Sequence, residues 1–523
     1  MSATQPTDFA PLEDDERALQ AFGYRQELHR RLGRYASFAA GFSFISVLTT
    51  VFQFFALGFS FGGPAFFWTW PVVLAGQFMV ALCFSELAAR YPISGSVYQW
   101  STRLSNAVFG WFAGWIMILG QIVVIAAAAL ALQVVMPAIW SGFQLVGSDP
   151  SPVSADGAAN AALLGMILLV ATTIVNVLEN RIMVRTNVIG VTLEIIGAVI
   201  IIVLLLTHAD HAPTITFHTG LPGSAFAALL VAAFAAAYVF IGFDSAGEMS
   251  EETNSPHAVA PRTILFAVGA AGVLGGLIIF SGLLAAPSLT DGRLATEGLS
   301  YVLTSRLGDW LGKLLLVDVV VAITVATISI QTSATRMLFS MARDGVVPFA
   351  RVLARVSPRT GMPTGTALVT GVLSAVIVAI NFVSPDAFLA IGTTCIVMLY
   401  IAYAMITAPM LRQRLRGDWR GGAPAGTDAH GKPLFSLGRW GLPVNVVAVL
   451  YGVGMAVNLA WPRIAVYAPA SHKWYFQWFT ALFVLGALVF GMAFRWWSGR
   501  SQQPADGLAP AGSPAAIGDA AEA

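Results

Sequence analysis

Tyr238-Val-Phe-Ile-Gly-Phe-Asp-Ser-Ala-Gly-Glu-Met-Ser-Glu-Glu252 ends an apolar run that starts near Ala225. The stretch places a glycine and several acids where a membrane-spanning helix would otherwise continue. A continuous spanning helix satisfies its own backbone, and charge at membrane depth is costly, so this combination indicates a helix that is broken for a purpose. In membrane transporters built from repeats, such a break is the usual sign of a substrate site.

The composition is that of a membrane protein, because 57% of the residues are hydrophobic and 11% are charged. A bilayer core takes roughly 20 apolar residues per helix. The sequence therefore predicts an all-α integral membrane protein of about 12 transmembrane helices. We expect the spans at about 38–61, 65–87, 107–138, 160–179, 186–206, 224–250, 262–286, 310–341, 365–382, 386–410, 442–461 and 474–495.

The distribution of basic residues predicts the orientation in the membrane. With a cytoplasmic N-terminus, all 28 Lys and Arg residues except five fall in cytoplasmic segments. The five on the outside are Arg293, Arg306, Lys313, Arg463 and Lys473. We expect a multi-pass protein of the cell membrane with both termini in the cytoplasm. The net charge of +1 gives no indication of nucleic-acid binding.

Three parts are visible along the chain. Residues 1–36 are predicted to be a cytoplasmic tail, in which Glu27–Tyr35 is a candidate for a basic interfacial helix. Residues 37–496 form the membrane domain. Residues 497–523 are rich in Ala, Gly, Pro and acids and are typical of a disordered tail.

A weak internal symmetry points to two related halves. The first span carries hydroxyl residues midway, in Ser43–Thr50, and five spans later the sixth carries the interruption at Gly242–Asp244. Interrupted helices at corresponding places favour an inverted repeat of five plus five spans with a site at the midplane. The alternative is a pair of ordinary kinks, because Ser, Thr and Gly are common in membrane helices.

Three groups of residues resemble a known family. Gly63-Pro64, Ser85-Glu86-Leu87 and Tyr91-Pro-Ile-Ser-Gly-Ser-Val-Tyr-Gln-Trp100 resemble spans 1–3 of the amino acid–polyamine–organocation superfamily. Gly242-Phe-Asp244, Glu251-Glu-Thr253 and Ala260-Pro-Arg262 are similar to its span 6–7 region, and Thr335–Pro348 to its span 8 exit. The resemblance covers about residues 37–410. It is closest to the amino acid/choline transporter branch, which includes γ-aminobutyrate (GABA) and choline permeases.

This resemblance implies a five-plus-five inverted repeat with discontinuous helices 1 and 6 and two extra helices. It implies a secondary active transporter of an amino acid, GABA, choline or a polyamine, which works by alternating access and is ion-coupled or exchanging. A transport-inactive sensor of the same fold is the alternative. We expect no enzyme activity, since no nucleophile–base set or metal cluster converges in the spans. No cofactor or metal is expected beyond coupling to H⁺ or Na⁺.

The two interruptions supply the predicted substrate-binding residues. An unwound first span would expose amide groups at the start of a half-helix, which favour a carboxylate. The half-helix that ends near Phe240 and Ile241 would offer free carbonyls to an ammonium group. Phe240 and Phe243 either close over the substrate or face lipid. The predicted set is Ser46, Val47, Leu48, Thr49, Thr50, Phe240, Ile241, Gly242, Phe243 and Asp244.

Coupling and gating are expected from five polar side chains in or next to the spans. Glu194, deep in span 5, is predicted to carry a proton or to help bind a cation, with a structural pair as the alternative. Glu248 is expected to act in coupling or to gate the cytoplasmic side by pairing with Arg336 or a loop arginine. Ser329 and Ser333 share a face of span 8 and offer oxygen ligands to sodium or ordinary interhelical bonds. Asp318 is a further intramembrane acid without an assigned role.

Overall fold

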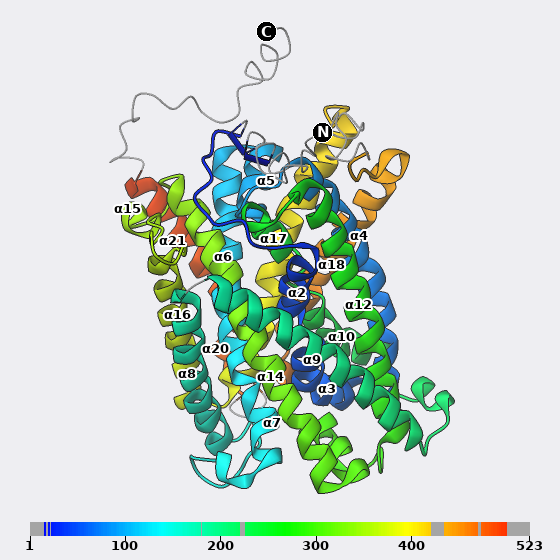
Figure 1. The fold of residues 1–523 in the computed structure, drawn as a ribbon. Helices are drawn as coiled ribbons and strands as arrows, with labels where there is room; N and C mark the ends of the chain where they lie inside the picture. The colour runs from blue at the N-terminus through cyan, green and yellow to red at the C-terminus, as the bar shows by residue number, and fades with distance from the viewer. Residues whose placement is uncertain are drawn as a thin grey trace, which may run out of the picture.

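The computed structural model describes residues 15–16, 19–20, 22–178, 180–219, 225–419, 433–468 and 472–498 (Figure 1). Apart from one isolated bridge between Leu32 and Thr253, these residues form only helices and connecting segments. The predicted disordered tail at 497–523 lies outside the described residues except for its first two positions. The first 14 residues of the predicted N-terminal tail lie outside them as well.

Every expected span carries helix. Ten helical stretches are long and apolar enough to cross a membrane within the described ranges. The first of them, Arg34–Arg90, holds two expected spans, and the apolar helix Ala225–Val239 is shorter than the rest. The main helices are α2 (Arg34–Ile45), α3 (Val47–Gly62), α4 (Thr69–Arg90), α6 (Ala107–Leu130), α7 (Leu132–Ile139), α8 (Ala155–Val177), α9 (Asn180–Thr207), α10 (Ala225–Val239), α12 (Pro256–Ala285), α14 (Leu299–Arg343), α16 (Thr364–Ala379), α17 (Asp386–Arg416), α18 (Gly441–Ala460) and α21 (Phe479–Ser498).

Short helices connect these spans. They are η1 (Gly63–Trp68), α5 (Ser96–Leu104), η2 (Ser141–Phe143), η3 (Pro213–Phe217), α11 (Ser245–Glu248), η4 (Ser250–Glu252), α13 (Gly292–Thr296), α15 (Ala350–Leu353), η5 (Ile380–Phe382), η6 (Gly438–Trp440), α19 (Ile464–Tyr467) and α20 (Trp474–Gln477). The eighth span is longer than expected, since α14 continues to Leu299 across a kink at Gly308, where φ is 73°.

The helix contacts repeat after five spans. The fifth span, α9, contacts the eighth, α14, and correspondingly the tenth, α17, contacts the third, α6. In the same way α8 contacts α14 while α16 contacts α6, and the equivalent second and seventh spans, α4 and α12, contact each other. The two halves therefore pack around one another as a five-plus-five repeat. The last two spans lie outside it, with α18 against α4 and α17 and α21 against α6 and α17.

The segment at residues 22–33 does not contain the interfacial helix considered for Glu27–Tyr35, because helix begins only at Arg34, the start of α2. It is extended and crosses one end of the bundle (dark blue in Figure 1). The amides of Arg31 and Leu32 donate to the carbonyl of Glu252, at 3.0 and 2.9 Å, and the Asn254 amide donates back to Leu32. Pairing with a loop satisfies the backbone as a helix would. We call this end, with residues 22–33, 91–95 and 250–255, the N-terminal face, and the end with residues 63–68, 141–154 and 286–298 the opposite face.

Candidate functional site

The first span is broken at one residue. Ser46 separates α2 from α3 with φ 37° and ψ 92°, a left-handed conformation that is uncommon outside glycine. The expected break over Ser46–Thr50 is therefore narrower in the structure, because α3 begins at Val47 and includes both threonines. The Ser46 side chain compensates the strain, since its hydroxyl donates to Glu194 Oε1 at 2.9 Å and lies 2.6 Å from Thr49 Oγ1.

Glu194 of α9 reaches the start of the half-helix that this break creates. Its Oε1 also accepts the Leu48 amide at 3.1 Å, and its side chain is 1% exposed. The first amides of a helix have no intrahelical partner and carry the positive end of the helix dipole, so they attract a carboxylate. The amide position that the sequence assigned to a substrate carboxylate is thus held by the protein's own carboxylate.

The sixth span is broken at Gly242. Its φ of 83° lies in the left-handed region, between the end of α10 at Val239 and the start of α11 at Ser245. The Gly242 amide donates to the Tyr403 hydroxyl at 2.7 Å, and this hydroxyl donates to Asp244 Oδ1, also at 2.7 Å. Tyr403 of α17 therefore bridges the break. Sequence reasoning missed this residue.

Asp244 is fully buried. Its second oxygen, Oδ2, has no hydrogen-bond partner among the described residues. A buried carboxylate oxygen without a donor is costly, and such atoms call for a functional explanation. An ammonium group of a substrate is one donor that would satisfy it.

The two breaks touch each other. A Cβ built on Gly242 would lie 1.7 Å from Cδ1 of Phe44, which stands two residues before Ser46. Only glycine lets the aromatic ring of the first break approach the backbone of the second so closely. The contact fixes the relative position of α2 and α11 across the centre of the bundle.

A small buried cavity lies between the breaks. Its walls come from the first and sixth spans and from α6 and α14, and they consist of Phe44, Ile45, Ser46, Thr49, Thr50, Val124, Ala128, Tyr238, Ile241, Ala326 and Ile330. The cavity volume is about 10 Å³, roughly enough for one water molecule. The cavity is therefore too small to hold an amino acid in this conformation.

Phe240 and Phe243 stand behind this cavity and do not line it. Phe240 packs on Trp70, with ring centroids 4.8 Å apart. Phe243 packs on Phe84 at 5.3 Å and on Tyr403 at 5.1 Å. Both rings are fully buried, so neither faces lipid. Of the predicted substrate residues on the sixth span, Ile241 reaches the cavity wall.

Glu248 does not pair with Arg336, one of the partners considered from the sequence. Gln121 of α6 donates to both of its carboxylate oxygens, at 2.8 and 3.0 Å, and the Ser333 hydroxyl of α14 donates to Oε2. Arg336 points instead to Glu252 of η4, with Nε 2.6 Å from Oε1. Glu248 lies four residues before Glu252 in the chain. Amide and hydroxyl donors therefore hold its carboxylate, and the ion pair with Arg336 is made by Glu252.

Ser329 and Ser333 have different partners although they share a helix face. Ser329 donates to the Ala40 carbonyl of α2 at 2.9 Å, while Ser333 reaches Glu248. In the opposite sense, Ser43 of α2 donates to the Val325 carbonyl at 3.2 Å. These reciprocal bonds join the inner half of the first span to α14.

Ion pairs close the N-terminal face. Glu251 and Glu252 are both buried and salt-bridged, and neither is solvated. Arg343 pairs with both oxygens of Glu251 at 2.9 and 3.0 Å, and the Ser94 amide donates to the same carboxylate at 3.1 Å. Breaking a buried ion pair leaves an uncompensated charge. Separating these pairs is therefore costly in free energy as long as water is excluded from them.

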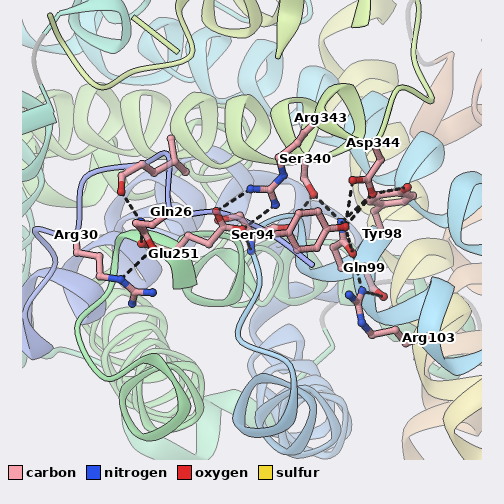
Figure 2. A network of polar contacts seen from close by, with 12 residues as sticks. Gln26, Arg30, Ser94, Tyr98, Gln99, Arg103, Glu251, Ser340, Arg343 and Asp344 are labelled. Carbon is pink, nitrogen blue, oxygen red and sulfur yellow. Dashed lines mark hydrogen bonds and ion pairs between the residues drawn. The ribbon is translucent and has the colours of Figure 1, made fainter. Parts of the chain in front are cut away.

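The extended N-terminal segment joins this network (Figure 2). The Tyr24 hydroxyl donates to Asp344 at 3.1 Å, and its ring lies 4.0 Å from the Arg343 guanidinium. Asp344 also accepts from Tyr98 at 2.9 Å, while Gln26 donates to the Glu251 carbonyl at 2.9 Å. The chain before the first span thereby binds across the N-terminal face.

Two broken membrane-spanning helices, packed on each other beside a small buried cavity, are typical of a membrane transport protein. A solved transporter structure shares this fold. The crystal structure of MhsT in complex with L-phenylalanine matches with a TM-score of 0.58 at 13% identity, over 82% of this chain and 99% of that one. The profile of the family described as "Amino acid permease" matches residues 33–488. The chain belongs to this amino acid permease family.

Relatives in plants and fungi agree with the assignment. Amino-acid permease BAT1 of Arabidopsis thaliana is 28% identical over 487 residues, which cover 87% of this chain and 90% of that protein. Amino-acid permease 2 of Neurospora crassa is 25% identical over 510 residues, which cover 93% and 88%. These relatives are permeases rather than enzymes.

Proposed function

We propose that this protein is a secondary active transporter that moves an amino acid or a related amine across the cell membrane by alternating access. The observation that carries the proposal is the pairing of the two breaks. The start of α3, whose Leu48 amide Glu194 caps, and the end of α10 meet at one cavity, so the amide and carbonyl ends of two half-helices would face the two ends of a zwitterion. MhsT, bound to L-phenylalanine, has the same fold.

The substrate contacts follow from this arrangement. The substrate carboxylate would take the amides at Val47 and Leu48, and its ammonium group would take the carbonyls near Phe240 and Ile241 together with Asp244. The unpartnered Oδ2 of Asp244 supports the second contact. Because two buried charges need partners, a molecule that lacks either charge is expected to bind weakly.

Glu194 supports a mechanism for coupling. While it is ionised, its carboxylate occupies the Leu48 amide and repels a substrate carboxylate. Protonation removes the charge and weakens the hydrogen bond, so the amide becomes free for the substrate. One proton would then enter with each substrate. A sodium ion held by Glu194 and the hydroxyls of Ser46 and Thr49 would couple by the same neutralisation.

The orientation is part of the proposal. The excess of Lys and Arg on the side of the N-terminal face supports a cytoplasmic location for this face. The network of Tyr24, Arg343 and Glu251 would then act as the cytoplasmic gate. Its separation, together with movement of α2, would open the cavity toward the cytoplasm.

Counterflow in proteoliposomes tests the function. Purified protein is loaded with an unlabelled amino acid, GABA, choline or a polyamine, and uptake of the labelled compound is measured. We expect trans-acceleration with at least one of them, and a proton or sodium gradient should drive its accumulation. A channel or an inactive sensor would show no trans-acceleration with any compound, which would overturn the proposal.

A further inference from the structure

A second, larger cavity lies apart from the paired breaks, near the N-terminal face, and shares no lining residue with the first cavity. Its volume is about 690 Å³, and it lies between α2 and α12. Arg34 and Tyr35 stand on the α2 side, and Arg262 and Phe266 on the α12 side. Both helices are membrane spans, so the cavity opens at the depth where one leaflet meets the water.

Two free positive charges mark this cavity. Arg34 and Arg262 are both exposed, and neither has an ion pair or hydrogen-bond partner in the part of the chain that the structure describes. The nearby acid, Asp15, is engaged elsewhere, since it accepts the Ser255 amide at 2.9 Å and pairs with Arg30 at 3.4 Å. Arginine is suited to bidentate binding of phosphate, so the two guanidinium groups favour a phosphate anion.

The rest of the wall is apolar and aromatic. Phe38 and Phe266 line the cavity, and Tyr35 is anchored at its rim by a 2.8 Å hydrogen bond to Thr192 of α9. The lipid-facing side of α12 continues outward from it, with Phe266, Val273 and Leu277 exposed by 68, 62 and 42%. A ligand whose phosphate meets the arginines would therefore lay hydrocarbon chains along this stripe.

We infer that this cavity binds an anionic phospholipid of the leaflet at the N-terminal face. The headgroup phosphate contacts Arg34 and Arg262, and the acyl chains follow the Phe266 side of α12. Basic pockets between transmembrane helices bind anionic headgroups in this way. Because α2 is the half-helix that ends at the Ser46 break, the bound lipid tethers the segment that must move if the site is to open on this side.

Lipid retention on the full-length protein tests the inference. The protein is purified from nanodiscs of equal parts phosphatidylglycerol and phosphatidylcholine, and bound lipid is counted by native mass spectrometry. We expect wild-type protein to retain phosphatidylglycerol preferentially. Each arginine contributes about fivefold in affinity, so Arg34→Gln with Arg262→Gln should lower the preference by about 25-fold.

The matched control removes the same charge from the same face. Arg351 and Arg355 are exposed on and beside α15, away from the cavity, so Arg351→Gln with Arg355→Gln should retain phosphatidylglycerol like the wild type. Equal loss in both double variants, or equal retention of the two lipids by the wild type, would overturn the inference. Displacement by soluble glycerol phosphate at the concentration of the lipid would also overturn it, because the acyl chains would then contribute nothing.

A measurement on the unmodified protein guards against a variant that fails to fold. Photoactivatable phosphatidylglycerol is incorporated in liposomes, and the labelled peptides are identified. We expect labels concentrated in residues 33–38 and 254–270. Labels spread evenly over the lipid-facing helices, or a cavity blocked by a second copy of the chain, would contradict the assignment.

Discussion

Glu194 Oε1 accepts the amide of Leu48 at 3.1 Å, so a carboxylate from the fifth span caps the half-helix that begins at the break in the first. The contact joins residues that are 146 positions apart. It joins the residue predicted for coupling to an amide predicted for substrate binding. A change in the charge of Glu194 would therefore change whether the Leu48 amide is available to a substrate.

Replacement of Glu194 by Gln should uncouple transport. The amide of Gln keeps an acceptor for Leu48 but cannot be ionised, so the site would be fixed in its neutral state. We expect gradient-driven uptake to fall by about 5- to 150-fold, the range that a coupling free energy of about 1–3 kcal/mol produces, with substrate exchange largely kept. Uptake and exchange are compared in proteoliposomes. Glu297→Gln, at an exposed pair on the opposite face, is the control, and equal loss of uptake and exchange would contradict the role.

Replacement of Gly242 by Ala should damage the site. The left-handed backbone costs a non-glycine residue roughly 1–2 kcal/mol, and the new Cβ would overlap the Phe44 ring. We expect a lower midpoint of thermal unfolding in detergent and loss of substrate counterflow. Gly454→Ala is the matched control, because nothing lies within 4 Å of its Cβ position in α18. If both variants behave alike, the close contact between the breaks is unimportant.

Tyr403→Phe should weaken the bridge across the second break. The change removes the donor to Asp244 and the acceptor of the Gly242 amide, and a hydrogen bond to a charged group contributes about 1.5–3 kcal/mol. We expect destabilisation of this size in the free energy of unfolding. Asp244→Asn should weaken substrate binding, and a double-mutant cycle should show that the two changes are not additive.

The control for this cycle is Tyr400→Phe, which removes a hydroxyl pair with Tyr451 at 2.9 Å and leaves the break intact. Substrate affinity is read from thermal shifts. Unchanged affinity in Asp244→Asn would leave this residue only a gating role, and additive effects would separate it from Tyr403.

Glu252→Gln should be strongly destabilising. Arg336 and Glu252 have side chains exposed by 0 and 1%, so the change leaves a buried guanidinium without its counter-ion, at a cost of about 3–5 kcal/mol. Glu297→Gln, at the exposed pair with Arg293, should cost less than about 1 kcal/mol. Chemical unfolding followed by tryptophan fluorescence compares the two. Similar small losses would show that the Arg336 pair is solvated.

The contact of Tyr24 with Asp344 should not depend on pH in the neutral range. Burial, and next the negative charge of Asp344, raise the pKa of the Tyr24 hydroxyl above its usual value of about 10. A raised pKa means that the stabilisation is fully present below about pH 10 and is lost as the pH rises through the value in the folded protein.

A spin label at Gln20→Cys reports this contact, because Cys83 and Cys395 are buried. We expect constant mobility of the label between about pH 6 and 9 and greater mobility above about pH 10. Tyr24→Phe should show greater mobility at every pH. A transition near neutral pH would mean that another group holds the segment.

Much of the fold was readable from the sequence. Apolar runs long enough to cross a bilayer predicted the spans, because each helix must satisfy its backbone within itself. The break at Gly242–Asp244 could be predicted because a glycine and an acid are costly inside a membrane-spanning helix. The narrower break at Ser46 was harder to locate, because a serine in a membrane helix usually bonds to its own backbone.

The tertiary structure alone decided the partners. Sequence reasoning selected Glu194, Ser46 and Leu48, yet nothing local places span 5 against span 1. The same holds for Tyr403 at Gly242, and for Arg336 with Glu252 instead of Glu248. Hydrophobicity and backbone satisfaction act within one helix and can be read along the chain. Pairing of buried polar groups depends on which helices pack together, and only the packed bundle determines that.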